Sequence, residues 1–109
     1  MSSPSMYVPD VAGLVGEITP DSIVSRTFYQ DELVKAILFG FAPGQELSEH
    51  TSAMPAALQI IQGEATITLG SETYEAGPGA WAHMDARLPH SIVARTTVVM
   101  LLWMFQRPK

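Results

Sequence analysis

Three histidines are the residues of this sequence best suited to chemistry at a shared site. His50 lies in the stretch GQELSEHTSAMPAALQIIQGE (residues 44–64), His90 lies in RLPHSI (87–92), and His83 lies on the predicted strand that leads towards His90. A neutral imidazole can ligate a divalent transition metal, or it can give a polar contact to a small organic ligand. Cysteine is absent, so no thiolate shares either task. The histidines therefore indicate metal binding or ligand binding through ring nitrogens.

A transition-metal site generally uses three or more protein ligands, so a third donor is needed beside His50 and His90. Glu49 is adjacent to His50, and in an extended strand its carboxylate points to the opposite side. His83 is the best candidate for the third ligand. The alternative for His83 is a partly buried ring that is hydrogen-bonded to a neighbour. The alternative for the other two is a pair of histidines that line a pocket without a metal.

The elements that carry these histidines are expected to be short β-strands. Apolar runs are broken by Gly and Pro about every 8–12 residues, which is typical of an all-β sandwich or barrel. Gly70-Ser71 suits a two-residue type II′ hairpin, because glycine supplies the positive φ. Residues 10–18 are expected to form at most a short helical turn. The predicted strands cover residues 22–29, 33–41, 58–62, 64–69, 73–76, 80–84, 91–96 and 98–106.

Composition excludes several classes of function. The 109 residues suggest one domain, and a net charge of -5 argues against binding to nucleic acid or to an anionic membrane surface. The longest apolar run, residues 98–105, is too short to span a bilayer. Residues 1–10 lack the features of a signal peptide, and the absence of cysteine fits a reducing compartment, so we expect a cytoplasmic protein.

The last predicted strand, VVMLLWMF (98–105), does not alternate between apolar and polar residues. A strand with one wet face should alternate, so both faces of this strand are expected to be covered. One face would be the core. A second subunit would cover the other, which predicts a homodimer; the alternative is that the N-terminal arm covers it.

The sequence contains two motifs with fixed spacing between their residues, and the first runs from Gly44 to Gly63. Gly44 is followed by five residues and His50, and Gly63 closes the motif. This spacing resembles the first motif of the cupins, which are small β-barrel proteins. Ser52 stands where that family has its second histidine, and Ala56 stands where it has a glutamate.

The second motif runs from Gly79 to Ala94 and is also similar to its cupin counterpart. Gly79 and His90 match the family pattern. Asp85 replaces the family's proline, Arg87 replaces its glycine and Ala94 replaces its asparagine. Five of the ten motif positions are kept, and every spacing is kept without a gap.

The resemblance covers about residues 33–105 and implies a double-stranded β-helix, the jelly-roll barrel of the cupins. It implies a cupin domain over residues 33–109, preceded by an arm and first strand over 1–32. Cupins hold Fe, Mn, Ni, Zn or Cu with three histidines and a glutamate. Carried over by position, that set becomes His50, Ser52, Ala56 and His90, an incomplete metal site with two imidazoles.

Three functions remain open because the fold hosts many activities. The first is a module that binds a small molecule in the barrel, with His50 and His90 as polar contacts. The second is a metal-dependent enzyme, such as an oxygenase or isomerase, that uses the same histidines. The third is an accessory protein with a vestigial pocket and no enclosed cavity near these rings. The residues expected to line the pocket are Ser52, Met54, Ala56, Met84, Arg87 and Trp103.

Overall fold

The computed structural model describes residues 4–106 and is built almost entirely of β-strands. No helix in that part of the chain is long and apolar enough to cross a membrane. The elements, in chain order, are η1 (Ala12–Val15, a 3-10 helix), β1 (Ile23–Gln30), β2 (Val34–Phe41), β3 (Glu46–His50), β4 (Ala56–Gln62), β5 (Ala65–Leu69), β6 (Glu72–Ala76), β7 (Trp81–Met84), β8 (His90–Ala94) and β9 (Val98–Phe105).

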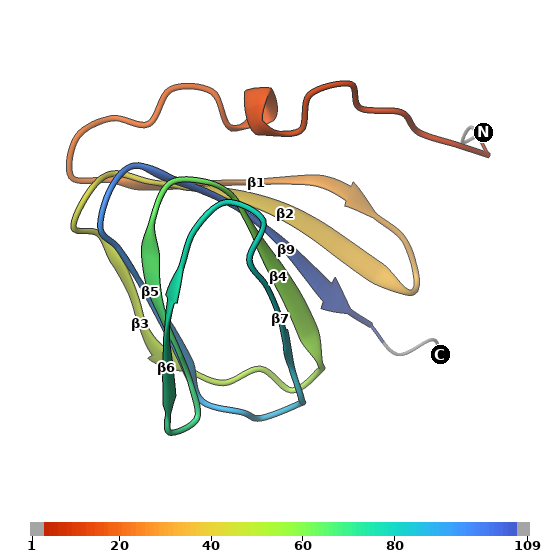
Figure 1. The fold of residues 1–109 in the computed structure, drawn as a ribbon. Helices are drawn as coiled ribbons and strands as arrows, with labels where there is room; N and C mark the ends of the chain where they lie inside the picture. Colours follow the sequence, from red (N-terminus) through yellow and green to blue (C-terminus); the bar gives the residue numbers. More distant parts are fainter. Residues whose placement is uncertain (1–3, 107–109) are drawn as a thin grey trace.

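The strands form two antiparallel sheets that face each other (Figure 1). One sheet has the order β1-β2-β9-β4-β7 and the other has the order β3-β8-β5-β6. Strands far apart in sequence, such as β2 and β9, are neighbours, as a jelly roll requires. The predicted jelly-roll fold is confirmed. Gly70 has a φ of 61° in the two-residue link between β5 and β6, as the predicted hairpin requires.

Side chains on the inner face of the four-stranded sheet change in size from one end to the other. At one end, the cross-strand row contains only alanines, and at the other end it contains the two histidines beside a leucine. These rows are Ala94, Ala65 and Ala76, and His50, His90 and Leu69. The three alanines belong to the same buried core cluster as Phe41, Ile60 and Val98. The core therefore closes one end of the barrel and leaves the histidine end less tightly filled.

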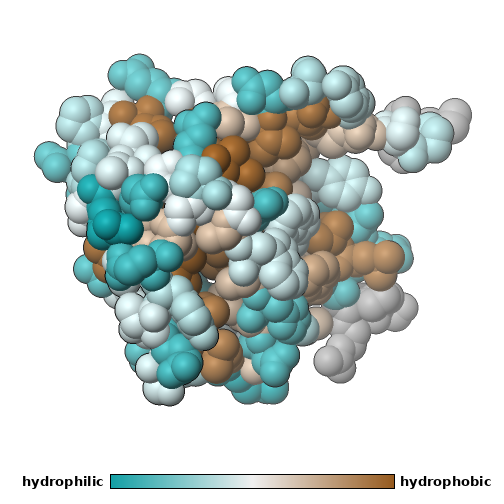
Figure 2. All heavy atoms as spheres, viewed as in Figure 1, coloured by the Kyte–Doolittle hydropathy of each residue, from teal (hydrophilic) through white to brown (hydrophobic). Residues whose placement is uncertain are grey.

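The outer face of the five-stranded sheet is covered by the segment that contains η1. Leu38, Val99 and Leu101 are buried in a second apolar cluster against this segment. The approach is close at Gly40, where an added Cβ would lie 2.7 Å from the Ile18 side chain. Figure 1 shows the segment lying across this sheet, and Figure 2 shows hydrophobic atoms in the seam between them.

This covering segment bears on the predicted homodimer. The outer face of β9 is covered within one chain at Val99 and Leu101, as the arm alternative expected. The pattern of β9 therefore has an explanation that needs no partner, and the homodimer stays a prediction.

The turn between β1 and β2 is held by Asp31. Its carboxylate accepts hydrogen bonds from the Tyr29 hydroxyl at 2.7 Å and from the backbone N–H groups of Leu33 and Val34 at 2.8 and 2.9 Å. These bonds favour the ionised form, and the Tyr29 hydroxyl contributes most to holding the pKa of Asp31 below its ordinary value. The same contact raises the pKa of Tyr29.

Candidate functional site

His50 and His90 come together at the open end of the barrel. They end β3 and begin β8, where they are direct cross-strand partners. Their ring centroids lie 4.1 Å apart at an interplanar angle of 62°. The expectation that the two rings converge is confirmed, although their role as metal ligands or pocket contacts stays a prediction.

An irregularity in β3 places the exposed His50 at the rim of the pocket that Leu47 also lines. Leu47 pairs with Ile92 and His50 pairs with His90, so β3 has one more residue than β8 between these pairs. Leu47 and His50 both line the same pocket although they are three positions apart, which regular alternation forbids. The extra residue of a β-bulge resolves this, since a bulge re-aims the side chains that follow it. β3 was not among the predicted strands, because its polar sequence ELSEH has no apolar alternation.

Backbone hydrogen bonds fix the tautomer of both rings. Nδ1 of His50 lies 2.9 Å from the Ser48 carbonyl oxygen, and Nδ1 of His90 lies 2.8 Å from the Leu88 carbonyl oxygen. A carbonyl oxygen can only accept, so each Nδ1 carries the hydrogen and donates it. Each neutral ring then keeps a bare Nε2 that can accept a hydrogen bond or a metal.

His90 is only 8% exposed, and of its two ring nitrogens only Nδ1 has a hydrogen-bond partner within residues 4–106. Every fully buried side-chain nitrogen or oxygen in that part of the chain is partnered. Nε2 therefore keeps access to the pocket that His90 lines. Because buried polar groups are normally hydrogen-bonded, the unpaired nitrogen of this ring is available to accept a hydrogen bond from a bound molecule.

The pocket at the histidine pair has a volume of about 290 Å³. Its polar groups are the two imidazoles and the hydroxyls of Thr51 and Ser52, and the remaining lining is apolar. The apolar residues are Ile37, Phe39, Leu47, Ala56, Leu102 and Met104. Of the pocket residues expected from the sequence, Ser52 and Ala56 line it.

Met84 and Trp103 lie elsewhere. Met84 is 1% exposed and belongs to the barrel core. Trp103 packs in the outer cluster with the N-terminal segment, and Met104, the next residue on β9, lines the pocket instead. The uniformly apolar sequence of β9 does not show which set of alternate residues points inward, so Leu102 was missed and Trp103 was chosen instead of Met104.

Met54 and Arg87 lie in the loops that flank the pocket and do not line it. The backbone N–H of Arg87 donates a hydrogen bond of 2.7 Å to the Ser52 carbonyl oxygen, which ties the loop before β8 to the loop after β3. Arg87 has a φ of 69°, a conformation that the glycine at this position of the cupin motif would adopt without strain. The contribution of Arg87 seen here is thus the backbone hydrogen bond that joins the two loops.

His83 does not join the histidine pair. It lies on β7, the edge strand of the other sheet, and lines a different cleft. Its side chain is 46% exposed, and Nδ1 lies 3.7 Å from Oδ1 of Asp85. It is thus neither the third ligand nor the partly buried ring considered from the sequence.

The donor set fits a ligand pocket better than a metal centre. The four positions that correspond to cupin metal ligands offer two imidazoles, the Ser52 hydroxyl and the Ala56 methyl group. Among residues 4–106, no group of three or more His, Cys, Asp or Glu side chains is placed to hold a metal ion. Two imidazoles fall short of the three or more protein ligands that such sites generally use.

Comparison with known proteins agrees with this fold. A family described as "Cupin domain" matches residues 37–105. A cupin superfamily protein from Desulfitobacterium hafniense is 26% identical with a TM-score of 0.85, and the match covers 95% of this chain and 94% of that one. A conserved protein of unknown function from Streptococcus pyogenes is 29% identical with a TM-score of 0.82, over 100% of this chain and 93% of the other. No curated protein matches the sequence.

An enzyme shares the fold at greater distance. Salicylate 1,2-dioxygenase from Pseudoaminobacter salicylatoxidans is 12% identical with a TM-score of 0.73. The match covers 80% of this chain and 26% of the dioxygenase. At this identity the likeness concerns the architecture and not the chemistry.

Proposed function

The chain belongs to the cupin family, and on that premise we propose that it binds a small molecule in the open end of its barrel through His50 and His90. The observation that carries the proposal is the pair of fixed tautomers, which leaves two Nε2 atoms without a hydrogen. Together with the apolar walls, this arrangement suits a compact compound that has an apolar body and a polar group at one end.

The chemical class of the polar group follows from the tautomers. A bare Nε2 accepts hydrogen bonds and donates none, so it favours a hydroxyl or an undissociated acid over a carbonyl or an ether. Ser52 and Thr51 add hydroxyls that can both donate and accept. A pocket of about 290 Å³ is at the small end of ligand sites, so the ligand has about one ring.

The two other functions have less support. A vestigial pocket predicts no enclosed cavity at the histidines; the pocket there is partly open, and its two convergent imidazoles between apolar walls favour ligand binding instead. A metal-dependent enzyme needs a ligand set that positions 52 and 56 do not supply. The salicylate 1,2-dioxygenase shares the fold, but no residue of this chain completes a metal centre within the part that the structure describes.

The proposal is tested with a matched pair of probes, phenol and its methyl ether, anisole. We expect phenol to move the Nε2 resonances of both histidines in ¹⁵N spectra, and anisole to bind at least tenfold more weakly, about 1.4 kcal/mol. His50→Ala and His90→Ala should each weaken phenol binding by a similar factor. His83→Ala, which removes an exposed histidine outside the pocket, is the control and should leave the phenol-induced shifts of His50 and His90 unchanged.

Two results would overturn the proposal. The first is phenol binding that is unchanged in both pocket variants. The second is a stoichiometric metal ion in protein that was purified without a histidine tag, since the metal would then occupy both Nε2 atoms and favour the enzyme.

A further inference from the structure

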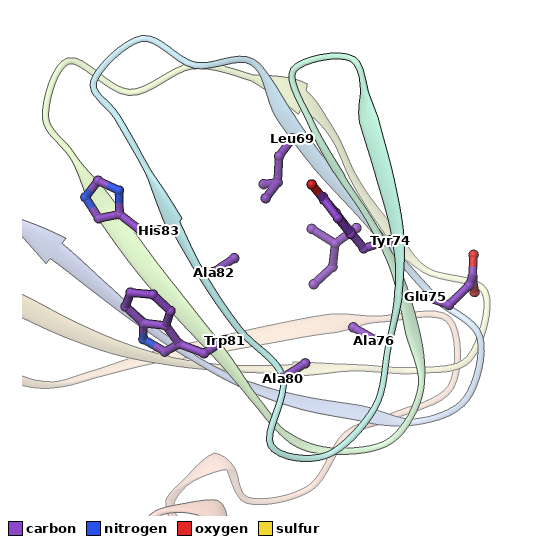
Figure 3. Close-up of a pocket in the computed structure, with 9 residues that line it drawn as sticks. Leu69, Tyr74, Glu75, Ala76, Ala80, Trp81, Ala82 and His83 are labelled. Atoms are coloured by element: carbon purple, nitrogen blue, oxygen red, sulfur yellow. The ribbon is translucent and has the colours of Figure 1, made fainter.

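A second cavity opens on the side of the barrel next to the histidine pair, since Leu69 in its lining is the cross-strand partner of His90. Strands β6 and β7 are the end strands of the two sheets, and no backbone ladder joins them. Between them lies a cleft of about 410 Å³. Its lining shares no residue with the histidine pocket and consists of Ile67, Leu69, Tyr74, Glu75, Ala76, Ala80, Trp81, Ala82 and His83 (Figure 3).

The cleft is hollow because the side chains that face it are small. Ala82 is an inward residue of β7, Ala80 directly precedes that strand, and Ala76 is an inward residue of β6. Packed sheets lie about 10 Å apart, so large side chains must fill the space between them. Elsewhere in the barrel residues such as Leu58 and Met100 do so. Native interiors are close-packed, which makes an unfilled side of a core a candidate for occupation by a ligand.

An aromatic side chain stands at the mouth of this cleft. Tyr74 belongs to the same inner row as Ile67, yet it is 50% exposed. Figure 3 shows its ring pointing from β6 across the opening toward Leu69, with Ala80 and Ala82 on the opposite side. An exposed ring beside an apolar floor offers a stacking surface for a second ring.

The charged groups at the border of the cleft are directed elsewhere. Glu75 leaves β6 on the outer face, where it pairs with Arg95 at 3.0 Å and accepts a hydrogen bond from Thr66. Trp81 and His83 leave β7 on the side away from Tyr74 (Figure 3). The interior of the cleft therefore has no charge to offer, and an ionised ligand would lose its hydration without a counter-charge.

We infer that the cleft between β6 and β7 is a second ligand site, which takes an uncharged planar aromatic compound. One ring of the compound stacks on Tyr74 and lies over Ala80 and Ala82, where it covers the apolar surface of Leu69. The two sites share no lining residue, so an experiment can refute one proposal and leave the other standing.

The test uses N-phenyl-1-naphthylamine, an uncharged aromatic probe whose fluorescence rises in apolar surroundings. Ala82→Leu fills the cleft from its floor, and we expect it to weaken probe binding at least tenfold while the melting temperature stays the same or rises. Tyr74→Ala removes the stacking ring and should weaken binding several-fold. His50→Ala leaves the cleft intact and should bind the probe as the parent protein does.

A direct contact measurement keeps the test decisive if a variant folds poorly. In the parent protein, nuclear Overhauser effects should connect the probe with the methyl protons of Ala80 and Ala82. The inference is overturned if those contacts are absent, if Ala82→Leu binds the probe unchanged, or if His50→Ala abolishes binding, since the last result would place the probe at the histidines.

Discussion

Replacement of Gly63 by alanine tests the closed end of the barrel. Gly63 ends the first cupin motif and has a φ of 89°, in the left-handed region. An added Cβ would meet the backbone carbonyl oxygen of Thr97 and would lie 3.0 Å from Oγ1 of Thr96. Because the first obstacle is backbone, a change of rotamer cannot relieve it, and the turn between β8 and β9 must move.

The size of the effect follows from two contributions. The left-handed conformation costs a non-glycine residue roughly 1–2 kcal/mol. Movement of the turn disturbs the hydrogen bonds that Glu64 makes with Thr96 and Arg95, each worth about 0.5–1.5 kcal/mol. Gly63→Ala should therefore lower the free energy of unfolding by roughly 2–5 kcal/mol. For a chain of this size, that corresponds to a melting temperature lower by about 8–20 °C.

Gly79→Ala is the matched control. Gly79 has a φ of 94° but no atom within 4 Å of an added Cβ, so this variant has only the conformational cost. Thermal and urea denaturation followed by circular dichroism would compare the two variants, with the m-value as a check that the unfolding reaction is unchanged. The reasoning is refuted if the variants of Gly63 and Gly79 melt within about 2 °C of each other.

Three further predictions address the site, the β1–β2 turn and the N-terminal segment. The double variant Ser52→His, Ala56→Glu should bind Zn²⁺ at least about 100-fold more tightly than the parent in calorimetry, because it restores two donors; an unchanged affinity would mean that these positions do not converge. Tyr29→Phe should raise the pKa of Asp31 toward 3.8 in a ¹³C titration. The stability that Asp31 contributes is complete above pH 3.8 and is lost as the pH falls through its lowered pKa. Because Tyr29→Phe brings this pKa closer to 3.8, the free energy of unfolding of the variant should fall less over that acid range. Gly40→Ala should speed hydrogen exchange in residues 10–18 and spare the barrel strands; equal protection in both proteins would contradict the close contact seen there.

Most strands were predictable because apolar alternation and turn residues are visible in the local sequence. The alternation in residues 64–69 and the Gly70-Ser71 turn specify the β5–β6 hairpin without help from the rest of the chain. The convergence of His50 and His90 followed from the family spacing. The segment around residues 10–18 forms only the four-residue η1, as its glycines suggested.

The details that decide chemistry were not readable, because they depend on tertiary packing. The bulge that places His50 at the rim of the pocket has no sequence marker, since neither Ser48 nor Glu49 is a glycine. The tautomers depend on carbonyl groups whose direction only the fold defines. The side cleft results from alanines that face each other across two sheets, and an alanine at position 80 or 82 gives no such signal alone.

The gradient of side-chain size along the barrel has a mechanical consequence. At the alanine end Ala65 and Ala94 lie in the buried core with Phe41, Ile60 and Val98, so the backbone amides of these residues should be the last to exchange with solvent. Thermal opening should start at the histidine end and spread from there. A compound bound at that end stabilises the closed state there, so it should also slow hydrogen exchange in the strands that open after the histidine end.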